Sequence, residues 1–498
     1  MYHRSVPRIG GVAALSGKRV AVFGAGMEGQ SFARRVGPSC SEIVVLDDLA
    51  GGRPASGGPG PSALGADLAD LNVRSPALLA ETPFDFVVHS PGVSRFDERL
   101  AEAVRLGAVV TTPTALFMED FADRQVVAVT GSKGKTTTAM LTVAVLRAYG
   151  LEVALAGNIG RPVTELYDDG AHDVFVVELS SFQAAEVTTS PTVGVLTLLA
   201  PDHLDWHRSI ENYYGDKLRL FSQRSDVPVA VNGCCDQAVA LSSELGGRVL
   251  YGEGGPVRLE GSRIVAAELG PLELGGFRLL GGHNLLNACG AITAGMLLTG
   301  DLPDRGRLEN ELCTVTAPRA RLEPIGSFGG VSYIDDALAS NPDGTIAALR
   351  VFAGRQVALI VGGFDRGLDY EPLARAIESG TPRPVVFWTG PAGKAIAAAL
   401  ERMSGAAARE EVASLEAAVA MASRMPGMEV VLFSPASPTP HDEGTYFDRG
   451  ERFRQAAARA TAEDSPSATG APATGAASNP PATGAPASSP PATRAPDS

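Results

Sequence analysis

Short apolar runs, each followed by a loop and then a helical pattern, recur along most of this 498-residue chain. β-Branched and aliphatic residues dominate these runs, which is typical of strands buried on both faces of a parallel sheet. The expected strands are 18–23, 43–46, 86–88, 109–112, 126–130, 174–177, 193–198, 228–232, 331–334, 357–361, 385–389 and 430–433. Residues 249–280 are glycine-rich and strand-like. Strands that alternate with helical stretches predict an α/β fold.

The spacing of these elements predicts three domains and a tail. We expect a Rossmann-like domain at 1–112, a central doubly wound domain at 113–317, a C-terminal Rossmann-like domain at 318–461 and a tail at 462–498. Residues 51–62 are rich in Gly, Pro and Ser, which predicts a flexible loop. The tail consists mainly of Ala, Pro, Thr, Ser and Gly, so it cannot form a core and we expect disorder.

The net charge excludes some classes of function, and the cysteine content indicates a cellular compartment. The net charge of −14 argues against a sequence-independent nucleic-acid binder, which needs a basic surface. The five cysteines contain no C-x-x-C pair and suit a reducing cytoplasm better than a disulfide scaffold. Neither a secretory signal nor a membrane span is expected, so we predict a cytoplasmic protein.

The stretch Val126–Thr138, VVAVTGSKGKTTT, carries the strongest chemical signal. A strand runs into the glycine loop 131–136 and a helical pattern follows, which is the context of a phosphate-binding loop. Lys135 would neutralise the β/γ-phosphates and Thr136 would reach Mg²⁺. The general pattern has a further glycine where Val129 stands, so an ordinary strand–turn–helix junction is the alternative.

A second glycine loop, Gly24-Ala25-Gly26-Met27-Glu28-Gly29, follows the first expected strand, and Asp47 follows the second. This is the Rossmann fingerprint, in which the acid binds ribose hydroxyls. By itself it is consistent with a dinucleotide, with a UDP group or with a plain packing turn.

Further polar residues follow the central strands. Glu178 ends a strand beside the phosphate loop, where a doubly wound sheet places a Mg²⁺ ligand. His203 lies in Asp202-His203-Leu204-Asp205, and Lys217 lies in a helical stretch. On chemistry alone, a surface-loop histidine and a lysine on a solvated helix face are the favoured interpretations. Asn284 and Asn287 are one helical turn apart.

Taken together, these motifs resemble the Mur ligase family, the ATP-dependent amide-forming enzymes of peptidoglycan synthesis. The resemblance covers about residues 17–460 and is carried by TGSKGKTTT, GNIG, ELSSFQ, DHLD, the neighbourhood of Lys217, GHNLLNA, Arg321-Leu322-Glu323 and the IDD strand end. The ELSSFQ form and the first domain favour a member that joins glutamate to UDP-N-acetylmuramoyl-L-alanine. The resemblance implies an acyl-phosphate route that yields ADP and phosphate.

The resemblance also implies the roles of individual residues. ATP would be bound by Gly131, Ser132, Lys133, Gly134, Lys135, Thr136, Thr137, Asn284, Asn287, Arg321 and Asp336. The UDP-linked substrate would be bound by Gly24, Gly26, Met27, Glu28, Gly29, Asp47, Ser90, Pro91, Gly92, Asn158, Ser180, Gln183 and His203. Two Mg²⁺ ions would use Thr136, Glu178, His203 and a carbamylated Lys217, and the catalytic residues would be Lys135, His203, Lys217 and Arg321.

Departures from the family pattern cluster where glutamate would bind. The usual Asp-Ser-Lys-Ala-Thr-Asn is Asp336-Ala337-Leu338-Ala339-Ser340-Asn341 here, and Arg366 stands where a lysine is usual. An arginine fork fixes a different geometry from a lysine. The implied glutamate-binding residues are Ser340, Arg366, Thr439 and Tyr446. This pattern resembles the variant that adds L-glutamate, in pathways where a separate UDP-muramoyl-dipeptide epimerase later inverts that residue.

Other interpretations remain open from the sequence. They are the ordinary D-glutamate-adding ligase, a ligase like folylpolyglutamate synthase, an NAD-dependent oxidoreductase and an inactive binding protein. A folylpolyglutamate synthase normally lacks a domain like residues 18–112. We expect a monomer that binds neither nucleic acid nor membrane.

Overall fold

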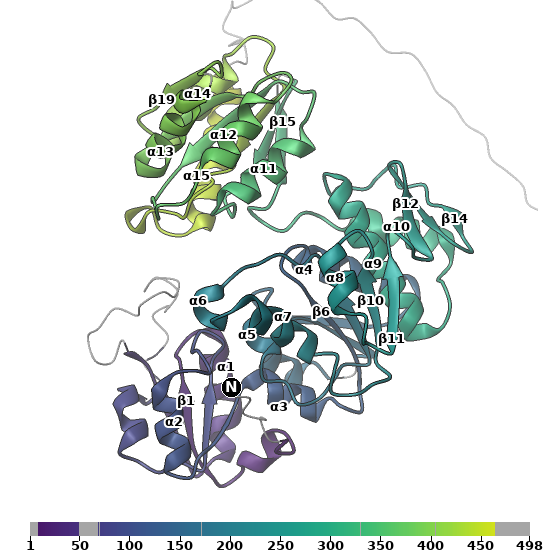
Figure 1. The fold of residues 1–498 in the computed structure, drawn as a ribbon, viewed down its shortest axis with the longest axis vertical. Helices are drawn as coiled ribbons and strands as arrows, with labels where there is room; N and C mark the ends of the chain where they lie inside the picture. The colour runs from purple at the N-terminus through teal and green to yellow at the C-terminus, as the bar shows by residue number, and fades with distance from the viewer. Residues whose placement is uncertain are drawn as a thin grey trace, which may run out of the picture.

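The computed structural model describes residues 8–48, 68, 70–170, 172–328, 330–403 and 405–463. Over these residues the chain forms three α/β units, each built on its own largely parallel sheet (Figure 1). The α/β fold expected from the sequence is confirmed. The loop expected at 51–62 and the tail beyond Glu463 lie outside the described residues, and the expected domain boundaries stay predictions.

The first unit is a five-stranded parallel sheet in the order β3-β2-β1-β4-β5. Its elements are η1 (Val12–Leu15), β1 (Arg19–Phe23), α1 (Met27–Val36), η2 (Gly37–Ser39), β2 (Glu42–Leu46), β3 (Val73–Arg74), η5 (Pro76–Ala80), β4 (Phe86–His89), α2 (Glu98–Arg105) and β5 (Val109–Thr111). The glycine loop after β1 therefore lies at the centre of the sheet, where the strand order reverses and open α/β sheets bind ligands.

The middle unit is a six-stranded parallel sheet in the order β11-β10-β9-β6-β8-β7. Its strands are β6 (Gln125–Thr130), β7 (Val153–Gly157), β8 (Val174–Glu178), β9 (Val193–Leu196), β10 (Pro228–Asn232) and β11 (Gly247–Tyr251). Its helices are α3 (Pro113–Asp120), α4 (Lys135–Ala148), η6 (Val163–Asp168), α5 (Ser181–Ala184), α6 (Leu204–His207), α7 (Ile210–Arg219), α8 (Asp236–Leu241), α9 (Gly282–Thr299) and α10 (Arg305–Thr314). A small antiparallel sheet follows: β12 (Val257–Glu260), β13 (Arg263–Ala266) and β14 (Gly270–Pro271).

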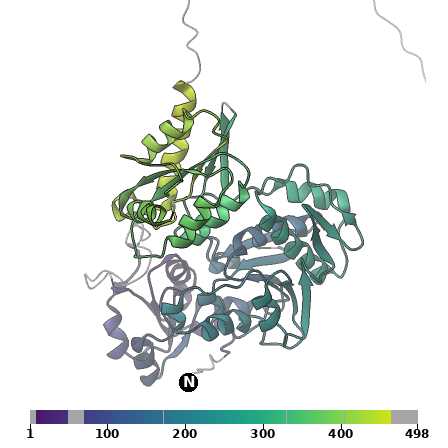
Figure 2. The same cartoon turned by 45° about the horizontal axis from the view of Figure 1, so that its top comes forward.

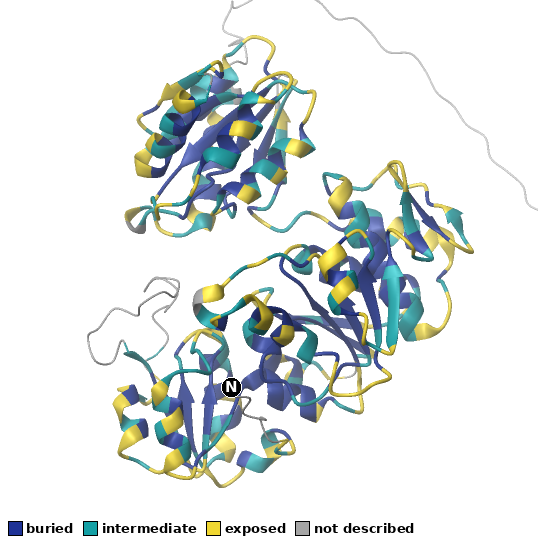
Figure 3. Cartoon of the chain, viewed as in Figure 1, coloured by how far each residue is buried: buried dark blue, intermediate teal, exposed yellow. Residues whose placement is uncertain are grey.

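Burial explains why the central strands are apolar throughout. One face of the middle sheet packs against α4 and α9, and the other packs against side chains from α3, η6 and α7. Figure 3 shows the sheets as buried layers with the exposed residues on helices and loops. Strands covered on both faces need apolar residues at every position, which is the pattern in the sequence.

The third unit is a six-stranded sheet in the order β15-β16-β20-β17-β18-β19, with β15 antiparallel at one edge. Its strands are β15 (Glu323–Phe328), β16 (Val331–Asp335), β17 (Val357–Gly362), β18 (Val385–Thr389), β19 (Arg409–Glu411) and β20 (Val430–Phe433). Its helices are α11 (Pro342–Val351), α12 (Glu371–Glu378), α13 (Gly390–Arg402), α14 (Leu415–Ser423), η7 (His441–Glu443) and α15 (Tyr446–Glu463). Figures 1 and 2 show this unit as a separate lobe.

Buried polar contacts join the first and middle units. His89 Nε2, at the end of β4, lies 2.8 Å from Glu186 Oε2, and both residues are buried. The Arg95 guanidinium lies 2.8 Å from Asp216 Oδ1 of α7, and Asp216 Oδ2 lies 2.6 Å from His207 Nδ1. Over the described ranges, no helix is long and apolar enough to cross a bilayer.

Gly194, in β9, is expected to tolerate no side chain. An added Cβ would overlap the ring of Phe221, so Gly194→Ala should destabilise the middle unit by about 1–3 kcal/mol through overpacking. Gly215→Ala is the matched control, because its Cβ would meet open space in α7 and should be neutral or stabilising by about 0.5–1 kcal/mol. Thermal unfolding midpoints check this, and equal midpoints for the two variants would contradict it.

Candidate functional site

The loop Gly131–Thr136 joins β6 to the N-terminus of the 14-residue helix α4. Gly131 and Gly134 have φ of +147° and +88°, a region that favours glycine. An added Cβ at Gly131 would overlap Thr197 Oγ1, so the cradle exists only because this side chain is missing. A glycine cradle that opens onto a helix N-terminus fits a chain of phosphates.

Groups outside the loop fix its backbone. Lys217 Nζ of α7 donates to the Gly131 carbonyl at 2.8 Å, and Thr197 Oγ1 donates to the Lys133 carbonyl at 2.7 Å. Ser132 Oγ donates to the Ala200 carbonyl at 2.7 Å and accepts from the Ala200 N–H at 2.9 Å. The loop conformation is therefore set by α7 and by the segment after β9.

The structure places both predicted lysines beside this loop. Lys135 Nζ donates to the Ser132 carbonyl at 3.2 Å. Burial lowers the pKa of Lys135, Glu178 opposes that shift, and the positive charges of Arg321 and Lys133 add to it. Lys217 is only 1% exposed, and burial together with the charge of Lys135 holds its pKa well below the usual range.

Asp202 is a member of this group that the sequence reasoning did not select. Its negative charge raises the pKa of both Lys135 and Lys217, so it lies within electrostatic reach of both amines. The available signal was its place as the first residue of Asp202-His203-Leu204-Asp205, directly after a central strand. We add it to the residues that surround the phosphate loop.

Glu178, the last residue of β8, carries an unsatisfied acceptor. Its Oε1 accepts from Asn158 Nδ2 at 2.9 Å, whereas its Oε2 is buried without a hydrogen-bond partner. Leaving a buried acceptor unpaired costs about 1–3 kcal/mol, so a group that supplies positive charge is expected there. The residue fits a Mg²⁺ ligand.

Unlike the buried Glu178, His203 lies at the protein surface. It is the N-cap residue of α6, its side chain is half exposed, and its ring centroid lies 4.9 Å from that of Phe182. No set of three or more His, Cys, Asp or Glu side chains in the described part of the chain forms a metal-binding group. Mg²⁺ is usually held by one or two carboxylates together with substrate phosphates, so the residues fit a nucleotide-bound ion better than a protein cage.

Asn284 and Asn287 lie beside the phosphate loop. Asn287 Nδ2 donates to Asn284 Oδ1 at 3.1 Å, and an added Cβ at Gly134 would lie 2.7 Å from Asn287 Oδ1. The packing of α9 on α4 thus brings residues more than 140 positions apart into one site.

Asp336 points inward at the end of β16. Its Oδ2 accepts from Ser434 Oγ at 2.7 Å, and its Oδ1 accepts from the Leu322 N–H at 3.1 Å. Burial raises the pKa of Asp336 to about 7, against the two hydrogen bonds and the charge of Arg321. Asp336 therefore ties the segment that carries Arg321 to the end of β20.

The glycine loop of the first unit is braced in a similar way. Ser90 Oγ donates to the Gly24 carbonyl at 2.7 Å, and Asp47 Oδ2 accepts from the Ala25 N–H at 2.8 Å. An added Cβ at Gly29 would overlap the Gly24 carbonyl oxygen. Gly26, Pro91 and Gly92 lie in the same pair of loops, and the Met27 side chain is exposed.

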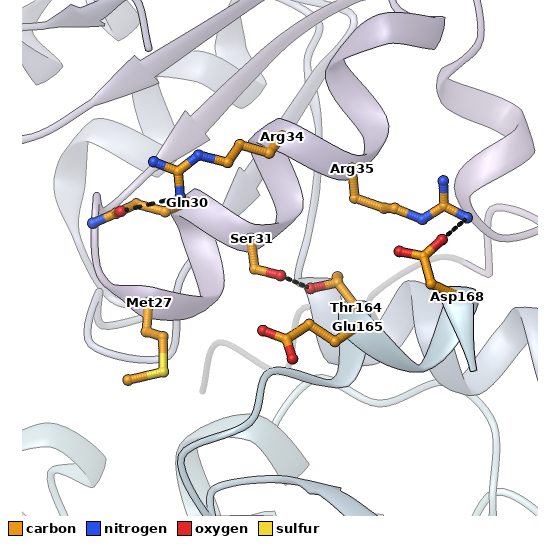
Figure 4. Close-up of a pocket in the computed structure, with 8 residues that line it drawn as sticks. All are labelled: Met27, Gln30, Ser31, Arg34, Arg35, Thr164, Glu165 and Asp168. Carbon is orange, nitrogen blue, oxygen red and sulfur yellow. Dashed lines mark hydrogen bonds and ion pairs between the residues drawn. The ribbon is translucent and has the colours of Figure 1, made fainter. Parts of the chain in front are cut away.

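Residues of the two units meet between α1 and α5. Gln183 Nε2 donates to Glu28 Oε1, while Gln183 Oε1 accepts from the N–H and Oγ of Ser180, both at 2.9 Å. A cavity of about 410 Å³ lies alongside, between α1 and η6. Figure 4 shows its lining, which is polar except for Met27: Met27, Gln30, Ser31, Arg34, Arg35, Thr164, Glu165 and Asp168.

The residues expected at glutamate lie on one edge of the third unit. Strands β16, β20 and β17 are neighbours, so the loops at their carboxyl ends share that edge. Ser340 and Arg366 are exposed there, whereas Thr439 and Tyr446 are partly buried. No hydrogen bond or ion pair joins two of these four described residues, so the structure does not assemble them into a set.

Arg449 is a second residue that the sequence reasoning missed. It is 1% exposed, its Nη2 donates to the Gly362 carbonyl at 3.0 Å, and its Nε lies 3.1 Å from Glu443 Oε2. It therefore connects α15 to the loop that carries Arg366. Hydrophobic periodicity could not single it out, because in sequence a buried arginine looks like any other charged helix residue.

Comparison with known proteins decides the family. The chain is 35% identical over 454 residues to the UDP-N-acetylmuramoyl-L-alanine–L-glutamate ligase of Salinispora tropica, an overlap of 89% of this chain and 98% of that protein. The chain belongs to the Mur ligase family. Residues 129–295 match the Mur ligase middle domain, and residues 320–437 match the Mur ligase glutamate ligase domain.

Other Mur ligases show the same likeness. The L-glutamate ligase of Xanthomonas axonopodis pv. citri is 32% identical, over 90% of this chain and 96% of its own. The UDP-N-acetylmuramoylalanine–D-glutamate ligase of Pelotomaculum thermopropionicum is 32% identical, and the match covers 88% of this chain and 97% of that protein.

Solved Mur ligase structures share the fold. The MurF ligase of Thermotoga maritima in complex with ADP matches with a TM-score of 0.56 at 16% identity, over 93% of this chain and all of that one. The UDP-N-acetylmuramate–alanine ligase MurC of the same organism matches with a TM-score of 0.55 at 18% identity, and the match covers 88% of this chain and 98% of that one.

The titration of Asp336 should lower the free energy of unfolding as the pH rises from about 4 to about 7. Its pKa is about 7 in the fold against an ordinary 3.8, so in this interval the folded state holds a proton that the unfolded state has lost. The stabilising contribution is complete below the ordinary pKa and lost as the pH rises through the folded one.

Urea unfolding midpoints across this pH range test the expectation. Asp336→Asn should show a shallower fall, with a residual slope from Asp335 and Glu28, whose pKa values burial raises to about 6 and about 7. The exposed Asp343→Asn controls for the loss of one carboxyl group. Identical slopes for wild type and Asp336→Asn would refute the assignment.

Proposed function

We propose that this Mur ligase adds glutamate, in the L form, to UDP-N-acetylmuramoyl-L-alanine at the expense of ATP, as a cytoplasmic monomer. The observation that carries the proposal is the braced cradle 131–136 with Lys135, Lys217 and the unsatisfied Glu178 oxygen around it. The names of the similar ligases support the substrates, and the ADP in a related structure supports the nucleotide.

The reaction needs an activated carboxylate, because a carboxylate oxygen is a poor leaving group. The γ-phosphoryl group of ATP moves to an oxygen of the terminal alanine carboxylate, which gives an acyl phosphate and ADP. The glutamate amine then attacks the carbonyl carbon, the tetrahedral adduct expels phosphate with the bonding electron pair, and the nitrogen loses a proton. Lys135 and Arg321 would hold the phosphoryl oxygens and neutralise their charge.

The residues also suit the metal chemistry of such a reaction. Glu178 and Thr136 would hold Mg²⁺ beside the phosphates, and His203 with Lys217 would complete a second site; the ion would supply positive charge there. A carbamate on Lys217 is consistent with its surroundings, because its lowered pKa favours the neutral amine that attacks CO₂. The nitrogen would lose one proton on forming the N–C bond and keep an N–H for the Gly131 carbonyl.

The choice of L-glutamate rests on the edge of the third unit. Leu338 stands where related enzymes carry a lysine, and it packs partly buried against the core of that unit, so no cation projects from that position. Arg366 is exposed on the neighbouring loop and would bind a carboxylate with a fork in place of a point charge. Overall identity does not separate the enantiomers, since two L-glutamate ligases match at 35% and 32% and a D-glutamate ligase matches at 32%.

Phosphate release from ATP should require UDP-N-acetylmuramoyl-L-alanine, Mg²⁺ and L-glutamate together, with little turnover on D-glutamate. Lys135→Ala should lower kcat/KM on the order of 10³-fold, because the transferring phosphoryl group loses a fixed cation. The exposed Lys394→Ala is the matched control and should be unaffected. Efficient use of D-glutamate alone would refute the assignment of L-glutamate but would leave the proposed ligase activity intact.

Activity should depend on dissolved CO₂ if Lys217 acts as a carbamate. Turnover should fall in bicarbonate-stripped buffer and return when bicarbonate is added, whereas Lys217→Arg should be inactive in both conditions because a guanidinium does not form the carbamate. Lys394→Arg should behave like wild type. Full activity of the wild type without bicarbonate would count against carbamylation.

A further inference from the structure

Glu28 occupies an unusual position for a carboxyl group. It is the second residue of α1, directly after the glycine loop of the first unit. A helix N-terminus at the carboxyl edge of a parallel sheet is where a Rossmann fold binds phosphates. A carboxylate there suits the helix dipole but would repel a diphosphate.

The contact with Gln183 fixes how Glu28 is presented. Ser180 donates to Gln183 Oε1 through its N–H and its hydroxyl, so the Gln183 amide group must turn its NH₂ towards Glu28. One carboxyl oxygen of Glu28 is therefore occupied by the middle unit. The other, Oε2, is buried and has no hydrogen-bond partner, so its hydrogen-bonding capacity is unsatisfied in the absence of a ligand.

Among the residues that the structure describes, no cation is paired with Glu28. Burial raises the pKa of Glu28 to about 7, and only the Gln183 hydrogen bond opposes that shift. The charged groups on the elements around α1 interact with partners other than Glu28. Four are ion pairs: Arg34–Asp70, Arg35–Asp168, Arg161–Glu165 and Arg19–Glu42. Three carboxylates accept hydrogen bonds instead: Glu119 from the amides of residues 9–11, Asp120 from Tyr167 and Asp47 from the Ala25 N–H. Figure 4 shows the Arg35–Asp168 pair on the far side of the cavity from Met27.

We propose that Glu28 binds the diphosphate of the nucleotide-linked substrate as a neutral carboxylic acid, with Oε2–H donating to a phosphate oxygen. The proposal rests on the function proposed above and adds a proton requirement to its substrate site. A neutral acid supplies a donor without repulsion, whereas the ionised form removes the donor and adds a negative charge beside the phosphates. Substrate binding above the pKa of Glu28 must therefore take up a proton at this atom.

The first test is the pH dependence of KM for UDP-N-acetylmuramoyl-L-alanine at saturating ATP and glutamate. In the wild type, KM should rise by up to about tenfold per pH unit above about pH 7. Glu28→Gln should show a flat KM, because its amide keeps an acceptor for Gln183 and a donor for the phosphate but does not titrate. Glu165→Gln, an exposed residue of the neighbouring cavity, should keep the wild-type profile.

The second test measures the proton directly. Calorimetric binding of the same substrate at about pH 8, in buffers of different ionisation enthalpy, should show uptake close to one proton for wild type and none for Glu28→Gln. Equal KM profiles and equal proton uptake in the two proteins would overturn the proposal. Absence of turnover in the wild type at every pH would instead overturn the proposed function, so the two failures are distinguishable.

Discussion

The backbone of the loop between β6 and α4 is shaped by groups that do not belong to it. Lys217 of α7 and Thr197, directly after β9, donate to carbonyl oxygens of the loop, and the Ser132 hydroxyl exchanges hydrogen bonds with the backbone of Ala200. Gly131 and Gly134 supply the backbone conformations that other residues would resist. The cradle is therefore formed before any nucleotide arrives. A preorganised phosphate site does not have to be ordered by its ligand, which preserves binding energy for catalysis.

The charges around this cradle are unbalanced in a way that suits an anionic ligand. Lys135 and Lys217 repel each other, and the nearby acids, Glu178 and Asp202, do not restore either amine to its ordinary pKa. Glu178 still has an oxygen without a partner. Phosphates beside Lys135 and a divalent ion beside Glu178 would satisfy both deficits together, and Lys217 would join the metal site in its proposed carbamate form.

The sequence predicted the strands that are apolar over their whole length, because two-sided burial leaves a continuous signal. It did not indicate β3, β7, β15 or β19: β7 is built of small residues, β15 contains proline and glycine at an edge, β19 is charged, and β3 has only two residues. The phosphate loop and Glu178 were visible because the loop directly follows a strand and Glu178 ends one. Asp202 stands in a recognisable motif, but only the fold brings it within electrostatic reach of Lys135 and Lys217. Arg449 and the Glu28–Gln183 contact depend on segments far apart in the chain, so no local pattern could reveal them.

The polar contacts between the first two units have a mechanical consequence. A rotation that broke the buried His89–Glu186 pair without exposing it to solvent would leave uncompensated charges, at a cost of about 3–5 kcal/mol. The Arg95–Asp216 pair adds less, because Arg95 is partly exposed and Asp216 keeps His207 as a partner. These two units therefore form a joint that resists rotation. The segment that enters the third unit is held in the same way. Ala320 and Leu322 take φ of 59° and 45°, the Leu322 N–H donates to Asp336 Oδ1, and the Ala320 carbonyl accepts from the Leu338 N–H, so this segment moves with the third unit.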